Sequence, residues 1–217
     1  MEFDLDQTDR LLSTTRSVRR RLDLERPVDR DALLECLRIA VQAPTGSNAQ
    51  TWRWLVVDDP AIRAALGDLY RRVAEQYLPG YRGETPFDAQ TTRVLESAEY
   101  LAGVIGRAPM LVVPCIKGRL TDTSAVSAAT LYGSIVPAVW SFQLALHSRG
   151  LGSCFTTLHL AREAEAAELL GIPDDVTQVA LLPVAFTSGG GFRPAERGPV
   201  ERITYWNRWK ANHPAGS

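Results

Sequence analysis

The sequence predicts a layered domain of helices and strands, of either the α/β or the α+β class. Patterns typical of helices and of strands follow one another along the whole chain, and pairs of helices separate successive strands. The 217 residues are 45% hydrophobic and 23% charged, the ordinary balance of a folded protein with a substantial core. We therefore expect a single domain over residues 1–217, and the pattern leaves the two classes open.

The first half of the chain predicts helices around one strand. A short helix is expected over residues 9–22, ending in a basic cluster. Asp29 is typical of an N-cap, and the helix that it begins ends at Pro44, because a proline disfavours helical geometry in the residue before it. Aromatic and β-branched residues over 52–57 predict a strand, and Asp59, followed by a proline, begins another helix.

The second half continues the alternation. Glycine, proline and polar residues make residues 79–90 a mobile loop, and a helix follows it up to Arg107. Gly171 ends a later helix, while Pro183 is expected to break a strand near its end. The remaining expected elements are a strand over 108–116, a long helix over 124–148, an extended segment over 150–158, a helix over 162–172, a strand over 176–186, and a glycine-rich loop over 188–194 before a short terminal helix or tail.

Charge and cysteine content exclude several classes of protein. The formal net charge is -1, whereas a general nucleic-acid binder would carry a basic excess. Cys36, Cys115 and Cys154 are odd in number, far apart and set among apolar residues, so we expect buried thiols rather than disulfides or a zinc site. The N-terminus is acidic and polar, unlike a signal peptide. A cytoplasmic location is therefore expected.

Common nucleotide and metal motifs are absent from the sequence. It has no P-loop, no HExxH and no CxxC, and its three histidines are scattered, so we expect no metal site. The run from Gly150 to Ser153 lacks the third glycine of a dinucleotide fingerprint. It also follows a helix rather than a strand, which is the wrong context for a Rossmann turn.

Three separated segments carry groups suited to an anionic, hydrogen-bonding ligand. In the first, a helix would place Arg16 on the same face as Arg19 and Arg20, with Ser17 as a neutral donor. Guanidinium groups bind phosphate through two parallel hydrogen bonds. The alternative is a solvated basic face.

The second and third segments are a polar loop and the C-terminal tail. Asn48 and Gln50 offer amide donors and acceptors, which suit the rim of a flavin ring, where one N–H donates and two carbonyl oxygens accept. Arg193 and Arg197, beyond the last strand, would return positive charge to the phosphate. A plain polar turn and a charged surface tail are the respective alternatives.

Taken together, these segments resemble the FMN-dependent nitroreductase family over about residues 10–209. The run Arg16-Ser17-Val18-Arg19 matches the family's phosphate motif. Ala43-Pro44-Thr45 followed by Asn48-Ala49-Gln50-Thr51-Trp52 matches its Asn-x-Gln-x-Trp segment, and Arg197 fits the basic tail. Two positions depart from the family: Thr15 replaces a second basic residue, and Ala195 replaces the tail lysine, so that Arg193 would have to supply this charge.

The resemblance implies an α+β, nitroreductase-like fold in which helices flank a mixed central sheet. It implies a homodimer that binds FMN between subunits and uses NADPH or NADH as co-substrate. No metal, nucleic acid or membrane is implied as a partner. The expected cofactor-binding residues are Arg16, Ser17, Arg19, Ser47, Asn48, Gln50, Ser153, Thr156, Thr157, Arg193 and Arg197.

The implied reaction is a ping-pong transfer of hydride through flavin N5 to a small-molecule electron acceptor: a nitroaromatic compound, a quinone or a flavin. The cofactor carries the chemistry, so no catalytic side chain is expected. Substrate contacts would come from variable loops, notably residues 78–92. Two alternatives stay open: a flavin-binding or storage protein without turnover, and a flavin-fragmenting or dehalogenating enzyme of the same fold.

The resemblance also accounts for the long helix over 124–148, which is apolar on nearly all faces. In the family this helix lies at a large two-fold interface, and Pro137 is expected to kink it. The alternatives are a central core helix in a monomer and a membrane span.

Overall fold

The computed structural model describes residues 2–81, 88–120 and 122–210, which form two compact units. Unit 1 combines Met1–Thr14 with Gly191–Ser217, and unit 2 comprises Thr15–Gly190. Unit 1 contains helix α1 (Leu5–Thr14) and a 3-10 turn, η4 (Val200–Arg202), and its described residues are mostly exposed. Unit 2 contains the sheet and every other element.

The sheet of unit 2 has six strands, and every strand pairing is antiparallel. The main order is β1-β6-β3-β2, with β4 paired to β6 and β5 paired to β3. An isolated parallel bridge joins Ser17 to Ser153. The fold is therefore α+β, as predicted, and isolated parallel bridges make its otherwise antiparallel sheet mixed. The strands are β1 (Leu22–Asp23), β2 (Trp52–Val57), β3 (Met110–Lys117), β4 (Leu151–Ser153), β5 (Val176–Gln178) and β6 (Leu182–Thr187).

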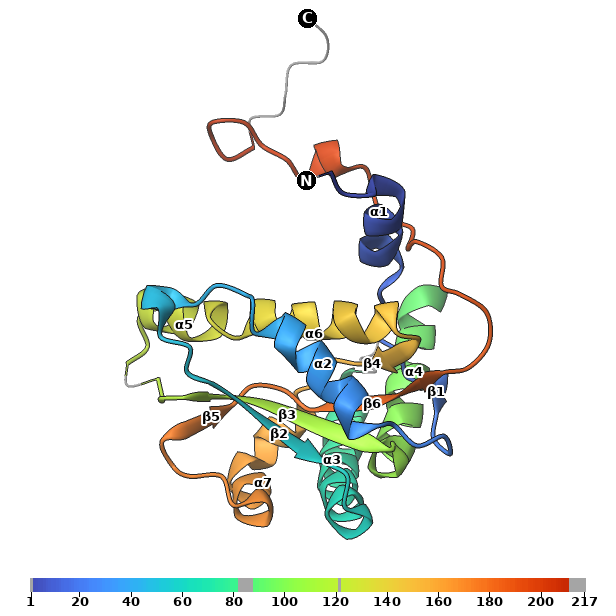
Figure 1. Ribbon diagram of the computed structural model, residues 1–217, viewed down its shortest axis with the longest axis vertical. Coiled ribbons are helices and arrows are strands. Elements are labelled where there is room, and N and C mark those ends of the chain that lie inside the picture. The colour runs from blue at the N-terminus through green and yellow to red at the C-terminus, as the bar shows by residue number, and fades with distance from the viewer. Residues whose placement is uncertain (1, 82–87, 121, 211–217) are drawn as a thin grey trace, which may run out of the picture. The chain divides into compact units, whose positions relative to one another are not determined.

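Two layers of helices cover the sheet. In Figure 1, α2, α5 and α6 lie on one face, while α3 and α7 lie on the other. Helix α4 packs against α3. The helices are α2 (Arg30–Ala40), α3 (Pro60–Tyr81), α4 (Ala89–Val104), α5 (Ala125–Gly133), α6 (Val136–Ser148) and α7 (Glu163–Leu170), and the 3-10 turns are η1 (Gly46–Asn48), η2 (Ile105–Arg107) and η3 (Leu158–Arg162).

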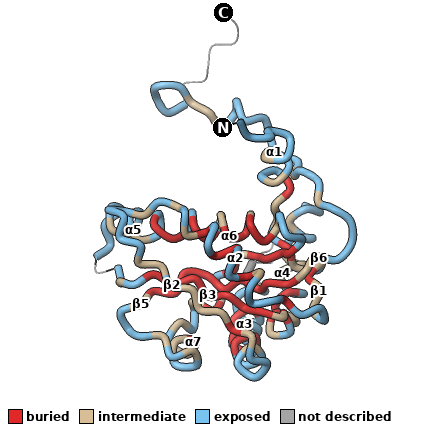
Figure 2. Tube along the Cα trace, in the orientation of Figure 1, coloured by how far each residue is buried: buried red, intermediate tan, exposed pale blue. Residues whose placement is uncertain are grey.

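Strand β3 runs through the centre of the core. Seven of its eight residues are buried, because helices cover both faces of the sheet. Val112 belongs to the cluster that packs against α2 and α6, together with Leu33 and Phe142, both of which are almost completely buried. Figure 2 shows this buried layer along β3 and α6. The continuous apolar run that predicted this strand thus reflects burial on both faces.

The long apolar helix is two helices rather than one. Helix α5 ends at Gly133 and α6 begins at Val136, with Pro137 in its first turn. Proline has no N–H for the carbonyl of Gly133, and its ring crowds that carbonyl, so the chain cannot continue as one helix. The predicted kink is therefore a break, placed just before Pro137.

The segment Ala125–Ser148 is long and apolar enough to cross a membrane by length and composition alone. A core helix of a soluble protein meets the same criterion. Helix α6 buries six residues against the rest of unit 2, whereas α5 buries none.

Three sequence predictions differ from the structure in their boundaries. The helix expected over 9–22 covers only Leu5–Thr14, because the chain from Thr15 onward runs out to pair with β4. The strand expected over 176–186 is two strands, since Leu181 bonds to Thr156 between them. Pro183 does not break the second strand but pairs within it, opposite Leu111.

The loop expected over 79–90 is wrong at both of its ends, which are helical. Helix α3 extends to Tyr81 and contains Pro79, and Asp88 caps α4 by accepting a hydrogen bond from the backbone N–H of Thr91. Residues 82–87 lie outside the described part of the chain. The predicted caps Asp29 and Gly171 are both confirmed, the latter with a left-handed φ of 66°.

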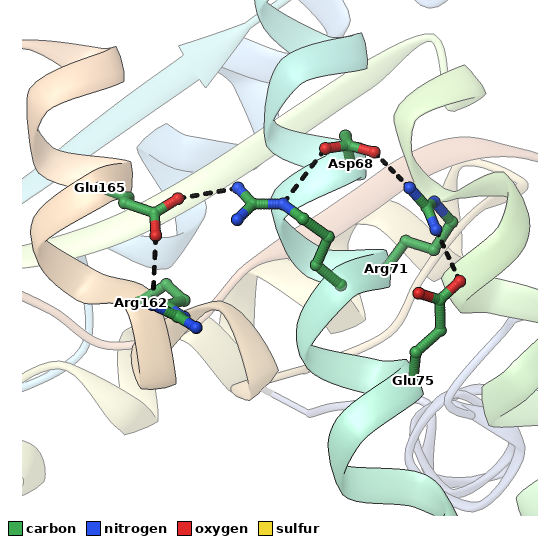
Figure 3. A network of polar contacts seen from close by, with 6 residues as sticks. Asp68, Arg71, Glu75, Arg162 and Glu165 are labelled. Carbon is green, nitrogen blue, oxygen red and sulfur yellow. Dashed lines mark hydrogen bonds and ion pairs between the residues drawn. The ribbon is translucent and has the colours of Figure 1, made fainter.

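A network of ion pairs ties α3 to α7 across the surface (Figure 3). The guanidinium of Arg72 binds Asp68 on its own helix at 3.2 Å and Glu165 on α7 at 2.7 Å. Arg71 joins Asp68 to Glu75. Hydrogen bonds from these arginines lower the pKa of Asp68 and of Glu165. These ion pairs link α7 to α3 on the surface of unit 2.

Helix α3 approaches η2 so closely that a side chain at Gly67 has no room. A Cβ there would lie 2.5 Å from the Cα and 2.7 Å from the backbone nitrogen of Gly106, and neither atom belongs to a flexible side chain. We expect Gly67→Ala to lower the free energy of unfolding by about 1–3 kcal/mol. Gly103→Ala is the matched control, because a Cβ there meets nothing within 4 Å, and it should stabilise by about 0.4–1 kcal/mol. Chemical denaturation of both variants checks this; equal effects would contradict it.

Candidate cofactor site

The predicted phosphate motif lies on an extended segment beside β4, not on a helix. The backbone N–H of Val18 donates to the carbonyl of Ser153 at 2.8 Å. Extended backbone sends successive side chains to opposite sides, so Arg16 and Arg19 do not share a helical face. Ser17 is exposed, while Arg16 and Arg19 are half-buried. Ser17 and Arg19 nevertheless lie on the same side, because both side chains approach the thiol of Cys154.

Ser17 and Arg19 border the buried thiol of Cys154. Burial raises the pKa of Cys154, and the Arg19 charge and hydrogen bonding by Ser17 only partly oppose this effect. The Arg19 guanidinium donates to the Ser97 hydroxyl of α4 at 3.2 Å. Cys154 is thus a neutral, buried group, and Arg19 is held between β4 and α4.

The other two arginines of the basic run have different partners. Arg20 lies over the ring of Tyr100, 5.6 Å from its centroid, and 3.9 Å from the Glu96 carboxylate. Arg21 donates to the backbone carbonyls of Ser188, at 2.7 Å, and of Gly190. Arg20 and Arg21 therefore have partners of their own, whereas Arg19 lies beside Cys154.

The segment after α6 holds its polar groups inside the fold. The buried Gln143 side chain donates to the Ser153 hydroxyl at 3.0 Å. Thr156 is buried and its hydroxyl donates to the Leu181 carbonyl at 2.8 Å, whereas Thr157 is exposed. Burial raises the pKa of Tyr70, which also bonds to Thr156, to about 12. Ser153 and Thr156 thus fix the strand behind the motif.

The polar loop before β2 has an unusual backbone. Ser47, Asn48 and Gln50 all have positive φ, of 53°, 52° and 49°. Such conformations are uncommon for residues other than glycine and cluster at ligand-binding and active sites. The side chain of Gln50 donates to that of Asn48 at 2.9 Å, and all three residues are exposed. The loop therefore displays its amides to solvent in a fixed, costly geometry.

The two halves of the predicted site lie apart within one chain. The loop contacts the α5–α6 junction through Gly46 and Ser134, whereas Ser17 lies by Ser153, which Gln143 holds in the second half of α6. Figure 1 shows η1 beside α5, and β1 and β4 toward the other end of α6. Along α6 alone, from Val136 just after this junction to Gln143, the separation is about 10 Å.

Arg193 and Arg197 belong to unit 1, so their contribution to the site stays a prediction. Sequence reasoning did not find Gln143 or Ser134, each a polar residue in an otherwise apolar helical segment. That contrast is the signal that would have marked them, since buried polar groups are normally bonded to something specific. The described residues contain no cluster of potential metal ligands.

Comparison with known proteins gives one consistent result. The Nitroreductase family model matches residues 12–186. The chain is 30% identical to an iodotyrosine deiodinase from Thermotoga neapolitana over 81% of this chain and 86% of that protein. It is 29% identical to an NADH dehydrogenase from Thermus thermophilus over 88% and 91%.

Among solved structures, iodotyrosine deiodinase bound to FMN and 3-iodo-L-tyrosine aligns with a TM-score of 0.71 and 23% identity, covering 91% of this chain and 98% of that one. At this identity the structural match supports the fold alone. The family model, which spans most of unit 2, and the 30% identical relative carry the assignment. The chain is a member of the nitroreductase family.

Proposed function

We propose that this chain forms a cytoplasmic homodimeric, FMN-dependent oxidoreductase that passes hydride from NADPH or NADH to a small-molecule electron acceptor. The observation that carries the proposal is the strained loop of Ser47, Asn48 and Gln50. Three non-glycine residues in the left-handed region are retained where a ligand uses the geometry that they impose. Membership of the nitroreductase family supports a flavin as the matching ligand.

The residues present fit FMN at both of its ends. An arginine and a serine hydroxyl on one segment, Arg19 and Ser17, suit a phosphate monoester. The exposed amides of Asn48 and Gln50 suit the donor and acceptor rim of the ring. The tail arginines, Arg193 and Arg197, would add charge at the phosphate end.

The chain's own groups would bind and orient, and they would not transfer protons. Bound FMN supplies the hydride chemistry at N5 for both half-reactions. Tyr70, with its pKa raised to about 12, and Cys154, with its pKa also raised, stay protonated at neutral pH. They supply neutral, rigid backing to the segment that carries Ser17 and Arg19.

The separation of the two halves supports a site shared between two chains. Helix α5 buries none of its residues, although its sequence is strongly apolar. Val126 is 75% exposed, and Tyr132, Val136 and Trp140 are 39–44% exposed along the same helix pair. Several exposed apolar side chains on one helix pair are typical of an interface. A second copy packed on it would bring the loop of one subunit toward the phosphate motif of the other.

A second candidate is reductive dehalogenation of a halogenated phenol. The observation that favours it is the 30% identity to a protein named iodotyrosine deiodinase, over 86% of that protein. The same bound cofactor would serve, so the two candidates differ only in the acceptor.

One series of measurements tests the proposal. The purified protein should be yellow and release FMN, and NADPH or NADH should bleach it under anaerobic conditions. A nitroaromatic compound or a quinone should then restore the colour, whereas iodide release from 3-iodo-L-tyrosine would select the second candidate. Failure to bind added FMN would refute the proposal, and binding without reduction would indicate a storage protein.

A further inference from the structure

Ser134, at the break between α5 and α6, is the point where the strained loop joins the rest of the fold. The residue is 7% exposed. Its hydroxyl accepts a hydrogen bond from the backbone N–H of Gly46 at 3.0 Å and donates to the Thr130 carbonyl at 2.7 Å. Its own carbonyl accepts from the indole N–H of Trp52 at 2.9 Å. One residue thus holds both ends of the segment 46–52.

The loop approaches this junction as closely as its backbone permits. A Cβ at Gly46 would lie 3.1 Å from the Thr130 methyl and 3.4 Å from the Ser134 hydroxyl. Inside the loop, the backbone N–H of Gln50 donates to the Thr45 hydroxyl at 3.2 Å. These contacts determine the path of the chain on both sides of Ser47 and Asn48.

Positive φ at several neighbouring residues persists only where surrounding contacts impose it. The loop itself is exposed, so burial does not impose it. Thr51 and Trp52 pair with β3, and the bonds to Ser134 link this segment to a buried residue at the α5–α6 break. Without the serine hydroxyl, the Gly46 N–H loses its acceptor and the loop is free to relax.

We propose that Ser134 is a positioning residue for the flavin ring, acting through the loop of Ser47, Asn48 and Gln50. This inference rests on the proposed function. Ser134 would touch no cofactor atom. It would preorganise the amides that do, so that the ordering of the loop does not oppose binding.

The test compares Ser134→Ala with the conservative Ser134→Thr and with Ser148→Ala. Ser148 is the matched control, because its hydroxyl also donates to a backbone carbonyl one turn earlier, that of Ala145 at 2.9 Å, and has no bond to the loop. The first readout is hydrogen exchange of the Gly46 amide in the apoprotein. The second is the dissociation constant for FMN and for riboflavin, measured by fluorescence titration.

In Ser134→Ala we expect faster exchange at Gly46 and an affinity for both flavins reduced by about tenfold. The loss should be equal for FMN and riboflavin, since it acts at the ring and not at the phosphate. Ser134→Thr should recover most of the affinity, and Ser148→Ala should match the parent. If Ser134→Ala does not fold, Trp52→Phe replaces it in the test. This variant removes the indole N–H that donates to the Ser134 carbonyl, and its affinity for both flavins should fall in the same way.

Unchanged flavin affinity in Ser134→Ala, with faster Gly46 exchange, would overturn the inference, because the loop would then have moved without consequence. A loss confined to FMN would also overturn it. A parent protein that binds no FMN would instead refute the proposed function. The two failures are therefore distinguishable.

Discussion

The His159→Leu variant is expected to avoid a loss of about 2 kcal/mol in the free energy of unfolding that His159 causes in the parent at pH 5. His159 is completely buried, and among the described residues neither ring nitrogen has a hydrogen-bond partner. Burial alone lowers its pKa to about 4, from an ordinary value of 6.5. The unfolded chain therefore binds a proton between pH 6.5 and pH 4 that the folded protein does not.

The direction of the effect follows from this difference. Between these pH values the unfolded state carries more protons, so stability falls as the pH is lowered. The parent should lose about 3 kcal/mol from this group by pH 4, whereas His159→Leu should lose none of it. At pH 7 the leucine variant should be at least as stable, because no buried nitrogen is left without a partner.

Urea denaturation at a series of pH values from 7 to 4 measures the slope for both proteins. His147→Leu is the control, since burial also lowers the pKa of His147 but His147 is only half-buried. Its slope should stay close to that of the parent. Parallel curves for the parent and His159→Leu would show that His159 is not the group responsible.

Arg19→Ala is expected to weaken FMN binding by about ten- to a hundredfold, the worth of one charge-assisted hydrogen bond. Arg197→Ala should do the same if the tail returns to the phosphate. Arg20→Ala is the internal control, because its guanidinium lies on Tyr100 and near Glu96. Riboflavin, which lacks the phosphate, should bind the Arg19→Ala variant and the parent alike. If Arg19→Ala and Arg197→Ala both bind FMN like the parent, the carried-over phosphate motif is wrong.

Mixing defective chains decides whether the site is shared. A chain carrying Arg19→Ala and a chain carrying Gln50→Ala are each expected to bind FMN poorly as homodimers. A mixed dimer, isolated with two affinity tags, should regain one tight site, since one intact motif then meets one intact loop. A mixed dimer without a tight site would mean that each chain builds its site from its own two halves.

Local signals in the sequence predicted the parts of the fold that local physics determines. Asp29 and Gly171 mark helix ends through their own hydrogen bonds and backbone geometry, and the apolar run of β3 follows from burial on two faces. The helix expected over 9–22 was wrong beyond Thr14, because the pairing of Val18 with Ser153 joins segments far apart in the chain. No local pattern encodes such a partner.

The same distinction applies to the candidate site. The residue types of the motif and of the loop are visible in the sequence, since arginine, serine and amides have recognisable chemistry. The residues that hold the loop and the motif in place are not visible in the sequence, because Ser134 and Gln143 act through tertiary contacts across the fold. The positive φ values at Ser47, Asn48 and Gln50 likewise depend on the contacts that anchor the loop. None of the three is a glycine, the residue type that would have predicted such a conformation from the sequence.

The distance along α6 between the loop and the phosphate motif has a consequence for how the protein keeps its cofactor. If the site is shared as proposed, a separated subunit carries one half of each of the two cofactor sites and no complete site. The fraction of protein that holds the cofactor then depends on the protein concentration as well as on the flavin concentration. Dilution that separates the subunits would release the flavin with every intrachain contact intact, and excess flavin would in turn hold the subunits together.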